Sequence, residues 1–93
     1  MIDTYQAAHE AVEREIGPLW GDTPGTFHVA AEGFEDADAY MVPWGAREWL
    51  VDGDTGFILL NGAVTFVDKM SGFVSIDTMV TNLQRIERMT RTR

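Results

Sequence analysis

Residues 63–76 read AVTFVDKMSGFVSI, and this stretch decides the fold. Apolar and β-branched residues dominate 63–67, and apolar residues return in 73–76, as in strands that pack against a core. Between them, Asp68 to Gly72 has the composition of a tight hairpin turn. The stretch therefore predicts an antiparallel pair of strands, around which the rest of the chain can be placed.

Two more strands are predicted upstream of this hairpin. Phe27 to Ala31 alternates between apolar and more polar residues, and a second strand places Tyr40, Val42 and Trp44 on one face. Pro43 has no N–H to donate, so we expect this second strand at a sheet edge or with a bulge. The composition of two connecting segments predicts turns: an acidic turn at 33–38, and an Asn61-Gly62 turn after the apolar run 57–60. The segment 47–50 is ambiguous, because it can either extend the strand or form a short helical turn.

Helices are predicted at both ends of the chain. The first has Asp3 as its N-cap and ends at Gly17-Pro18. Its apolar residues recur at three- and four-residue spacing: Tyr5, Ala8, Val12, Ile16 and Leu19. The second helix begins at Asp77 or Thr78, and its apolar stripe contains Met79, Val80, Leu83, Ile86 and Met89. We expect residues 90–93 to be frayed.

These elements predict one α+β domain spanning residues 1–93, because 93 residues suffice for one core only. The order is an N-terminal helix, an antiparallel sheet of about four strands and a C-terminal helix, with a single layer of helix on the sheet. The side chains expected on the covered face are Phe27, Val29, Tyr40, Val42, Phe66, Val67, Phe73 and Ile76.

The second half of the chain resembles a small bacterial family. The motifs are Ala46-Arg47-Glu48-Trp49-Leu50 followed by Gly53-Asp54, then Leu60-Asn61-Gly62-Ala63, then Phe66-Val67-Asp68-Lys69 with Ser71-Gly72. In this order and spacing, over roughly residues 39–89, they resemble the YrhB-like family, also called the immunity protein 35 family. The sequence departs from the family in having Ala63-Val64 where a proline is common, and in a shorter loop at 52–57. The resemblance implies a cytosolic α+β domain. Many relatives are immunity proteins that neutralise a toxin by direct binding, and others are stand-alone proteins, some of them chaperone-like.

The chain is acidic, with a formal net charge of −8, and the charge is unevenly distributed. Residues 1–84 hold fourteen acidic against three basic residues, whereas the last nine hold four arginines against Glu87. The acidic body opposes nucleic-acid binding and favours either solubility alone or a partner with a basic face. The arginines near the C-terminus fit the helix macrodipole. No cysteine, no secretory signal and no apolar run of membrane length occur, so a cytoplasmic location is the expectation.

No motif for covalent chemistry stands out. The chain has two serines, Ser71 and Ser75, and Ser71 belongs to the hairpin turn. No Gly-x-Ser-x-Gly elbow and no glycine-rich phosphate loop is present. His9 and His28 lack partners at metal-ligand spacing, and Asp52-Gly53-Asp54 is only a fragment of a calcium loop. We therefore predict no catalytic residue, no metal and no cofactor.

The predicted function is protein binding without catalysis, through an acidic surface with aromatic residues. The candidate contact residues are Asp36, Asp38, Trp44, Arg47, Trp49, Asp52 and Asp54. Arg47-Glu48 can equally be an ion pair that fixes its own segment, and the tryptophans can equally belong to the core. Two alternatives stay open: a chaperone-like binding protein, and a small enzyme built on carboxylates and His28. The chain is expected to be a monomer or a homodimer, the latter by pairing of the edge near Pro43.

Overall fold

The computed structural model describes residues 1–58 and 62–92, and it confirms the α+β fold class. The first helix, α1, spans Tyr5–Ile16. Its N-cap is Thr4 and not Asp3: the Ala7 N–H donates to Thr4 Oγ1 at 3.1 Å, so the helix begins one residue later than predicted. Gly17 stays right-handed, and the chain continues as a short 3-10 helix, η1 (Gly17–Leu19), which leaves Leu19 exposed.

The predicted hairpin forms two neighbouring strands at one end of a five-stranded antiparallel sheet. Its strands are β5 (Ala63–Asp68) and β6 (Val74–Thr78). The Asp68 carboxylate fixes the turn, because Oδ1 accepts hydrogen bonds from the N–H groups of Met70 and Ser71 at 2.9 and 2.8 Å. Gly72 ends the turn with a φ of +74°, a conformation that favours glycine. The sheet order is β6-β5-β3-β2-β7, so β6 and β7 are its two edges.

The segment before the hairpin divides between two sheets. It forms β3 (Ala39–Met41), which pairs with β5, and β4 (Trp44–Ala46), which pairs with β1 (Phe27–Val29) in a separate two-stranded sheet. Pro43 lies between β3 and β4, where its missing N–H costs no ladder bond. The acidic segment predicted as a turn contains β2 (Phe34–Glu35), a strand too short to give an alternating pattern.

The chain between β4 and β5 begins with a short helix, α2 (Arg47–Leu50), which confirms the helical alternative for that segment. The 3-10 helix η2 (Thr55–Phe57) follows. The predicted apolar run at 57–60 and the Asn61-Gly62 turn fall partly on residues 59–61, which lie outside the described residues.

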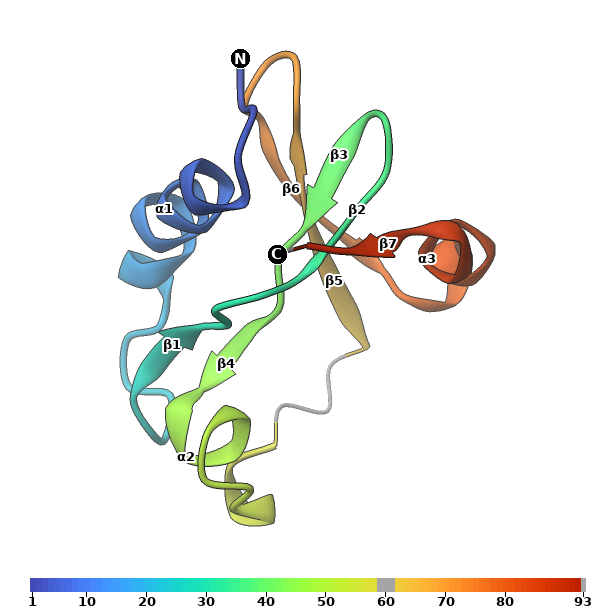
Figure 1. The fold of residues 1–93 in the computed structure, drawn as a ribbon. Coiled ribbons are helices and arrows are strands. Elements are labelled where there is room, and N and C mark those ends of the chain that lie inside the picture. The colour runs from blue at the N-terminus through green and yellow to red at the C-terminus, as the bar shows by residue number, and fades with distance from the viewer. Residues whose placement is uncertain (59–61, 93) are drawn as a thin grey trace.

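The core has two parts, one on each face of the five-stranded sheet. The part beneath α1 is built from Tyr5, Ala8, Ala11, Val12, Ile16, Val29, Tyr40, Val42 and Val67. The part on the other face is built from Ala39, Met41, Val64, Phe66 and Met89, with Ile86 of the second helix packed against it. Figure 1 shows α1 and α3 on opposite sides of the sheet, so helices cover both faces and not one. Two predicted core residues are exposed, Phe73 at 68 % and Ile76 at 52 %, because both lie on or beside the edge strand β6.

The C-terminal region differs most from the prediction. A 3-10 helix, η3 (Val80–Asn82), precedes a short helix, α3 (Leu83–Arg88), and much of the predicted stripe is exposed, with Val80 at 79 %. Residues 90–92 are not frayed, contrary to the prediction. Thr90–Arg91 form β7 and pair with β2, and the Gly33 N–H donates to the buried Thr92 hydroxyl at 2.9 Å. Within the described ranges, no helix combines the length and apolarity needed to cross a bilayer.

Candidate protein-binding surface

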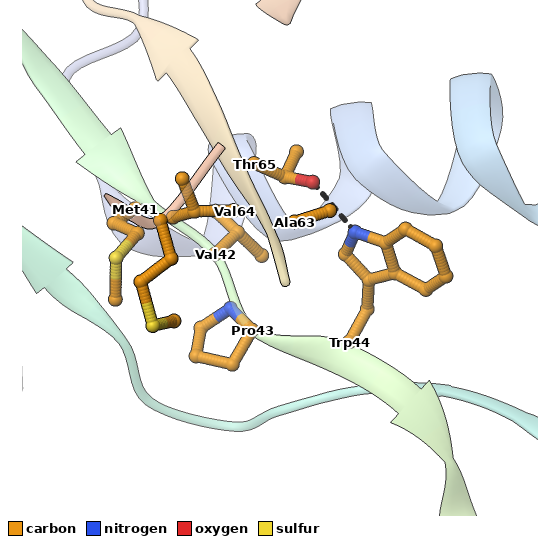
Figure 2. Close-up of a pocket in the computed structure, with 8 residues that line it drawn as sticks. Met41, Val42, Pro43, Trp44, Ala63, Val64 and Thr65 are labelled. Carbon is orange, nitrogen blue, oxygen red and sulfur yellow. Dashed lines mark hydrogen bonds between the residues drawn. The ribbon is translucent and has the colours of Figure 1, made fainter. Parts of the chain in front are cut away.

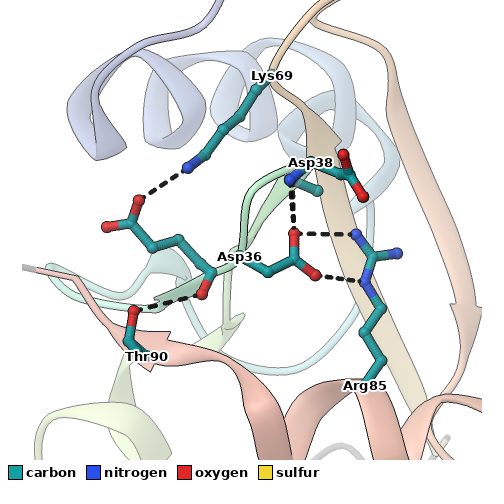
Figure 3. A network of polar contacts seen from close by, with 7 residues as sticks. Asp36, Asp38, Lys69, Arg85 and Thr90 are labelled. Carbon is teal, nitrogen blue, oxygen red and sulfur yellow. Dashed lines mark hydrogen bonds and ion pairs between the residues drawn. The ribbon is translucent and has the colours of Figure 1, made fainter.

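The carboxylate of Asp36 makes its hydrogen bonds inside the fold. Its carboxylate binds Arg85 of α3, with Nε to Oδ2 at 2.8 Å and Nη2 to Oδ1 at 3.3 Å. Its Oδ1 also accepts the N–H groups of Asp38 and Ala39, both at 2.9 Å (Figure 3). The hydrogen bond from Arg85 is the main reason that the pKa of Asp36 falls to about 2. Asp36 therefore holds α3 against the β2–β3 turn.

Other polar contacts around Asp36 also join elements of the fold to one another. Lys69 Nζ lies 2.8 Å from Glu35 Oε1 and 4.6 Å from the centre of the Tyr40 ring. The Arg85 guanidinium lies 4.5 Å from the centre of the Phe66 ring. Asp38 is exposed, but it sits at this end of the molecule, far from α2 in Figure 1. The two predicted acidic contacts in the β2–β3 turn thus belong to a different surface from the remaining acidic ones.

Trp44 is half-buried and points into the molecule. Its Nε1 donates to Thr65 Oγ1 of β5 at 2.7 Å (Figure 2). Its ring packs against Trp20 and Phe27, with centroids 6.4 and 5.9 Å away. The pocket beside it measures about 160 Å³, below the range of small-molecule sites. Trp44 joins the two-stranded sheet to the five-stranded sheet and packs against the core, which agrees with the alternative that this tryptophan has a structural role.

The helix α2 is fastened to the loop before β1. The Arg47 N–H donates to the Thr26 carbonyl at 2.8 Å. The Glu48 carboxylate accepts from the Thr26 N–H at 2.9 Å and from its hydroxyl at 3.1 Å. The backbone bond from Thr26 is the main cause that lowers the pKa of Glu48. Arg47 and Glu48 do not form the ion pair that was one of the two alternatives: Glu48 binds Thr26 instead, and the Arg47 side chain is exposed.

Gly25 permits the close approach beneath α2. It has a φ of +93°, and a Cβ there would lie 2.8 Å from the Phe57 ring and 2.9 Å from Ala46 Cβ. The four-residue helix is thus held from below by backbone contacts and by Glu48, which makes it a rigid support for the side chains on its outer face.

Apolar and acidic side chains are exposed along α2 and the residues that follow it. Trp49 is 37 % exposed, Leu50 36 % and Val51 53 %. Asp52 and Asp54 follow directly and are both exposed. Asp54 also accepts the Gly56 N–H at 3.0 Å, which caps η2 and fixes the loop. We name this surface the α2 patch; its members are Arg47, Trp49, Leu50, Val51, Asp52 and Asp54.

The structure thus brings four of the seven predicted contact residues together in the α2 patch. Leu50 and Val51 were missed by the sequence prediction. The signal for them was present, because Trp49 and Leu50 end α2 and Val51 follows directly, and consecutive side chains at a helix end point in different directions, so they cannot all face inward.

Side chains that bind metal ions do not gather in the parts of the chain that the structure describes. No cluster of three or more metal-ligating side chains occurs among residues 1–58 and 62–92. His28 lies in β1 opposite Gly45, and its side chain makes no hydrogen bond or ion pair with another described residue. His9 joins α1 to β1, with Nε2 3.2 Å from the Val29 carbonyl oxygen.

Comparisons of the chain with protein-family models, with curated proteins and with solved structures found no match.

Proposed function

We propose that this chain is a non-catalytic protein-binding domain, and that it binds through the α2 patch. The observation that carries the proposal is the exposed run Trp49-Leu50-Val51, 36–53 % exposed, on a short helix fixed by Glu48 and Thr26. A rigid support lowers the entropy lost on binding, and tryptophan is the residue type most enriched at the energetic centre of interfaces.

The charge of the surface indicates the kind of partner. Asp52 and Asp54 border the apolar residues, and the chain as a whole carries a net charge of −8. A partner with a basic rim around an apolar pocket would be attracted over long range and would bury Trp49 at the centre. Arg47 adds a group that binds a carboxylate through two hydrogen bonds, which would set the orientation of the partner.

The resemblance to the YrhB-like family supports a specific form of this function. The α2 patch contains most of the Arg47-Glu48-Trp49-Leu50 motif and Asp54 of the Gly53-Asp54 motif. We therefore propose that the chain is an immunity-type protein of the bacterial cytoplasm, which neutralises a toxin by covering a basic surface that the toxin needs for activity.

The experiment pairs the chain with the product of the adjacent toxin gene in its source genome. Co-expression should restore growth, and the purified proteins should form a one-to-one complex by calorimetry. Trp49→Ala should weaken the complex by at least about tenfold, as expected for a central tryptophan. Asp52→Lys should slow association strongly.

Glu87→Lys is the matched control, because it changes net charge by the same amount on α3, away from the patch. If it weakens the complex as much as Asp52→Lys does, charge acts without a specific surface and the α2 patch is the wrong site. If the neighbouring toxin does not bind at all, the immunity function is wrong.

A further inference from the structure

The edge strand β6 has a free stretch of backbone at its centre. Two backbone hydrogen bonds fix the pattern of its ladder with β5: the Asp68 N–H donates to the Phe73 carbonyl at 3.0 Å, and the Met79 N–H to the Gly62 carbonyl at 2.8 Å. On the other side of β5, the Val42 N–H donates to the Thr65 carbonyl at 3.0 Å, so the Thr65 backbone faces away from β6. Because bonded and non-bonded pairs alternate in an antiparallel ladder, Ser75 and Asp77 face β5. The N–H and C=O groups of Val74 and Ile76 therefore point outward, and no described residue binds them.

This free stretch is short and well defined. It ends at Thr78, whose N–H donates to Asp77 Oδ1 at 2.7 Å and whose carbonyl accepts from Asn82 Nδ2 at 2.7 Å. At the other end the chain enters the hairpin turn at Gly72. Only Val74 and Ile76 are left with open donors and acceptors, and they stand symmetrically on the two sides of Ser75.

Apart from the charge of Asp77, the strand lacks the features that usually protect a sheet edge. Residues 73–78 contain no lysine, arginine or proline, and the register with β5 runs without a bulge. The opposite edge, β7, is only two residues long and carries Arg91, whose guanidinium lies over the Phe34 ring. One edge of the sheet is thus protected and the other is open.

Apolar side chains accompany the open backbone. Ile76 is 52 % exposed and Leu19 of η1 is 73 % exposed. Together with Glu15 they border a groove of about 540 Å³ that runs along residues 72–76. A strand added at this edge would place its own aliphatic side chains in that groove, beside Val74 and Leu19.

We propose that the occupant of this edge is β6 of a second copy of the same chain, antiparallel, with the two-fold axis at Ser75. In that register Val74 faces Ile76 of the partner copy, and each such pair exchanges both hydrogen bonds. A register centred on Val74 or on Ile76 leaves some of these groups unpaired. The two sheets then join into one continuous sheet, with α1 of each copy on the same face.

The side chains agree with this register. Val74 and Ile76 of one copy meet Ile76 and Val74 of the other, which forms one aliphatic row across the axis. Asp77 faces Phe73 of the partner copy and not the second copy of Asp77. The charged residues of the two strands therefore stay apart, although each chain is acidic. The strand β6 and the helix α2 lie apart in Figure 1, so the proposed contact between the two copies does not involve α2.

The test uses single cysteines, because the chain has none of its own. Ser75→Cys places two thiols at the non-bonded pair on the axis, about 4.5 Å apart between Cα atoms, which suits a disulfide. Asp77→Cys, on the same face of the same strand, places them roughly 14 Å apart. Mild oxidation should therefore cross-link the first variant nearly completely and the second hardly at all. Equal cross-linking of both variants, or of neither, overturns the proposed register.

Sedimentation equilibrium then tests the dimer itself. The wild-type chain and Trp49→Ala should both show twice the chain mass of 10.4 kDa. Ile76→Pro should be monomeric, because it removes an outward N–H and costs no bond to β5, so circular dichroism should stay that of the folded wild type. A wild-type chain that is monomeric at millimolar concentration, or a folded Ile76→Pro variant that remains dimeric, overturns the proposal.

Discussion

Single side chains in this protein join segments that are far apart in the chain. The indole of Trp44 and the hydroxyl of Thr65 connect the two sheets through one hydrogen bond of 2.7 Å. Thr65 is 3 % exposed, so water cannot replace the indole as its partner. Trp44 is therefore a structural connection between the two sheets, and this role can be measured as a change in stability.

Replacing Trp44 by phenylalanine should lower the free energy of unfolding by about 1–3 kcal/mol, because the Thr65 hydroxyl loses its donor and the ring loses contact area. Urea unfolding measures the change. In the background of Thr65→Val, the same replacement should cost about 1 kcal/mol less, since no hydroxyl is then left unpaired. Equal costs in both backgrounds would show that the hydrogen bond contributes nothing.

The pair of Asp36 and Arg85 predicts a dependence of stability on pH. The pKa of Asp36 is about 2 in the folded chain against an ordinary value of 3.8, so the folded state prefers the charged carboxylate. The stabilisation that results is complete above pH 4, and it is lost as pH falls through about 2. Asp36→Asn should therefore cost about 1–2 kcal/mol at pH 7, a range reduced for partial exposure, and almost nothing near pH 2.

Chemical denaturation at a series of pH values measures this difference between wild type and variant. Asp38→Asn is the matched control two residues away, because the Asp38 carboxylate is exposed and makes no hydrogen bond to a described residue. Its cost should stay small at every pH. A cost of Asp36→Asn that grows as pH falls would contradict the proposed cause.

At the level of elements, the parts of the fold that follow from local sequence were predictable. The hairpin of β5 and β6 has both its alternation and its turn chemistry within sixteen residues, and α1 has an unbroken stripe. Strands β2 and β7 have two residues each, so their pairing depends on the finished sheet and leaves no local pattern. The stripe from Met79 to Met89 misled the prediction, because its periodicity continues over a segment that the structure divides into η3 and α3.

The end of the chain should contribute to stability, although its composition suggests fraying. The Gly33 N–H is buried, and its acceptor is the hydroxyl of Thr92. Thr92→Val should therefore cost about 1–2 kcal/mol and should speed hydrogen exchange at the Gly33 amide. Thr90→Val is the matched control, since the Thr90 hydroxyl is exposed and its hydrogen bond to the Glu35 carbonyl oxygen is long, at 3.5 Å. A Thr92→Val variant as stable as Thr90→Val would mean that the tail is not docked in solution.

At the level of the whole molecule, the candidate site could be predicted only in part. Arg47, Trp49, Asp52 and Asp54 are neighbours in the chain, and they stay neighbours in space. Asp36 and Asp38 are also near them in sequence, but the chain changes sheets at Pro43 and carries the two groups to opposite ends of the fold (Figure 1). Sequence distance therefore failed as a guide where the backbone passes from one sheet to the other.

The excess of acidic residues acts on the molecule as a whole. Fifteen acidic residues face seven basic ones, and few of the described acids are paired with a lysine or arginine. Among the described residues, Lys69 pairs with Glu35 and Arg85 with Asp36, while Glu13 contacts His9, which is an ion pair only when the imidazole is protonated. Compaction brings the remaining carboxylates closer together, so the folded state suffers more repulsion than the unfolded chain. Salt screens that repulsion over distances beyond about 5 Å, whereas the two ion pairs are in direct contact and lose less.

Raising NaCl from about 0.02 M to about 0.5 M should therefore stabilise the fold by about 1 kcal/mol, which raises the melting temperature by several degrees for a domain of this size. Differential scanning calorimetry at pH 7 and fixed protein concentration measures the shift. The variant Asp22→Asn with Asp52→Asn removes two exposed carboxylates that make no hydrogen bond to a described residue, so it should be more stable at low salt and respond less to added salt. A melting temperature that falls as salt is added would show instead that the ion pairs of Asp36 and Glu35 outweigh the repulsion of the acidic body.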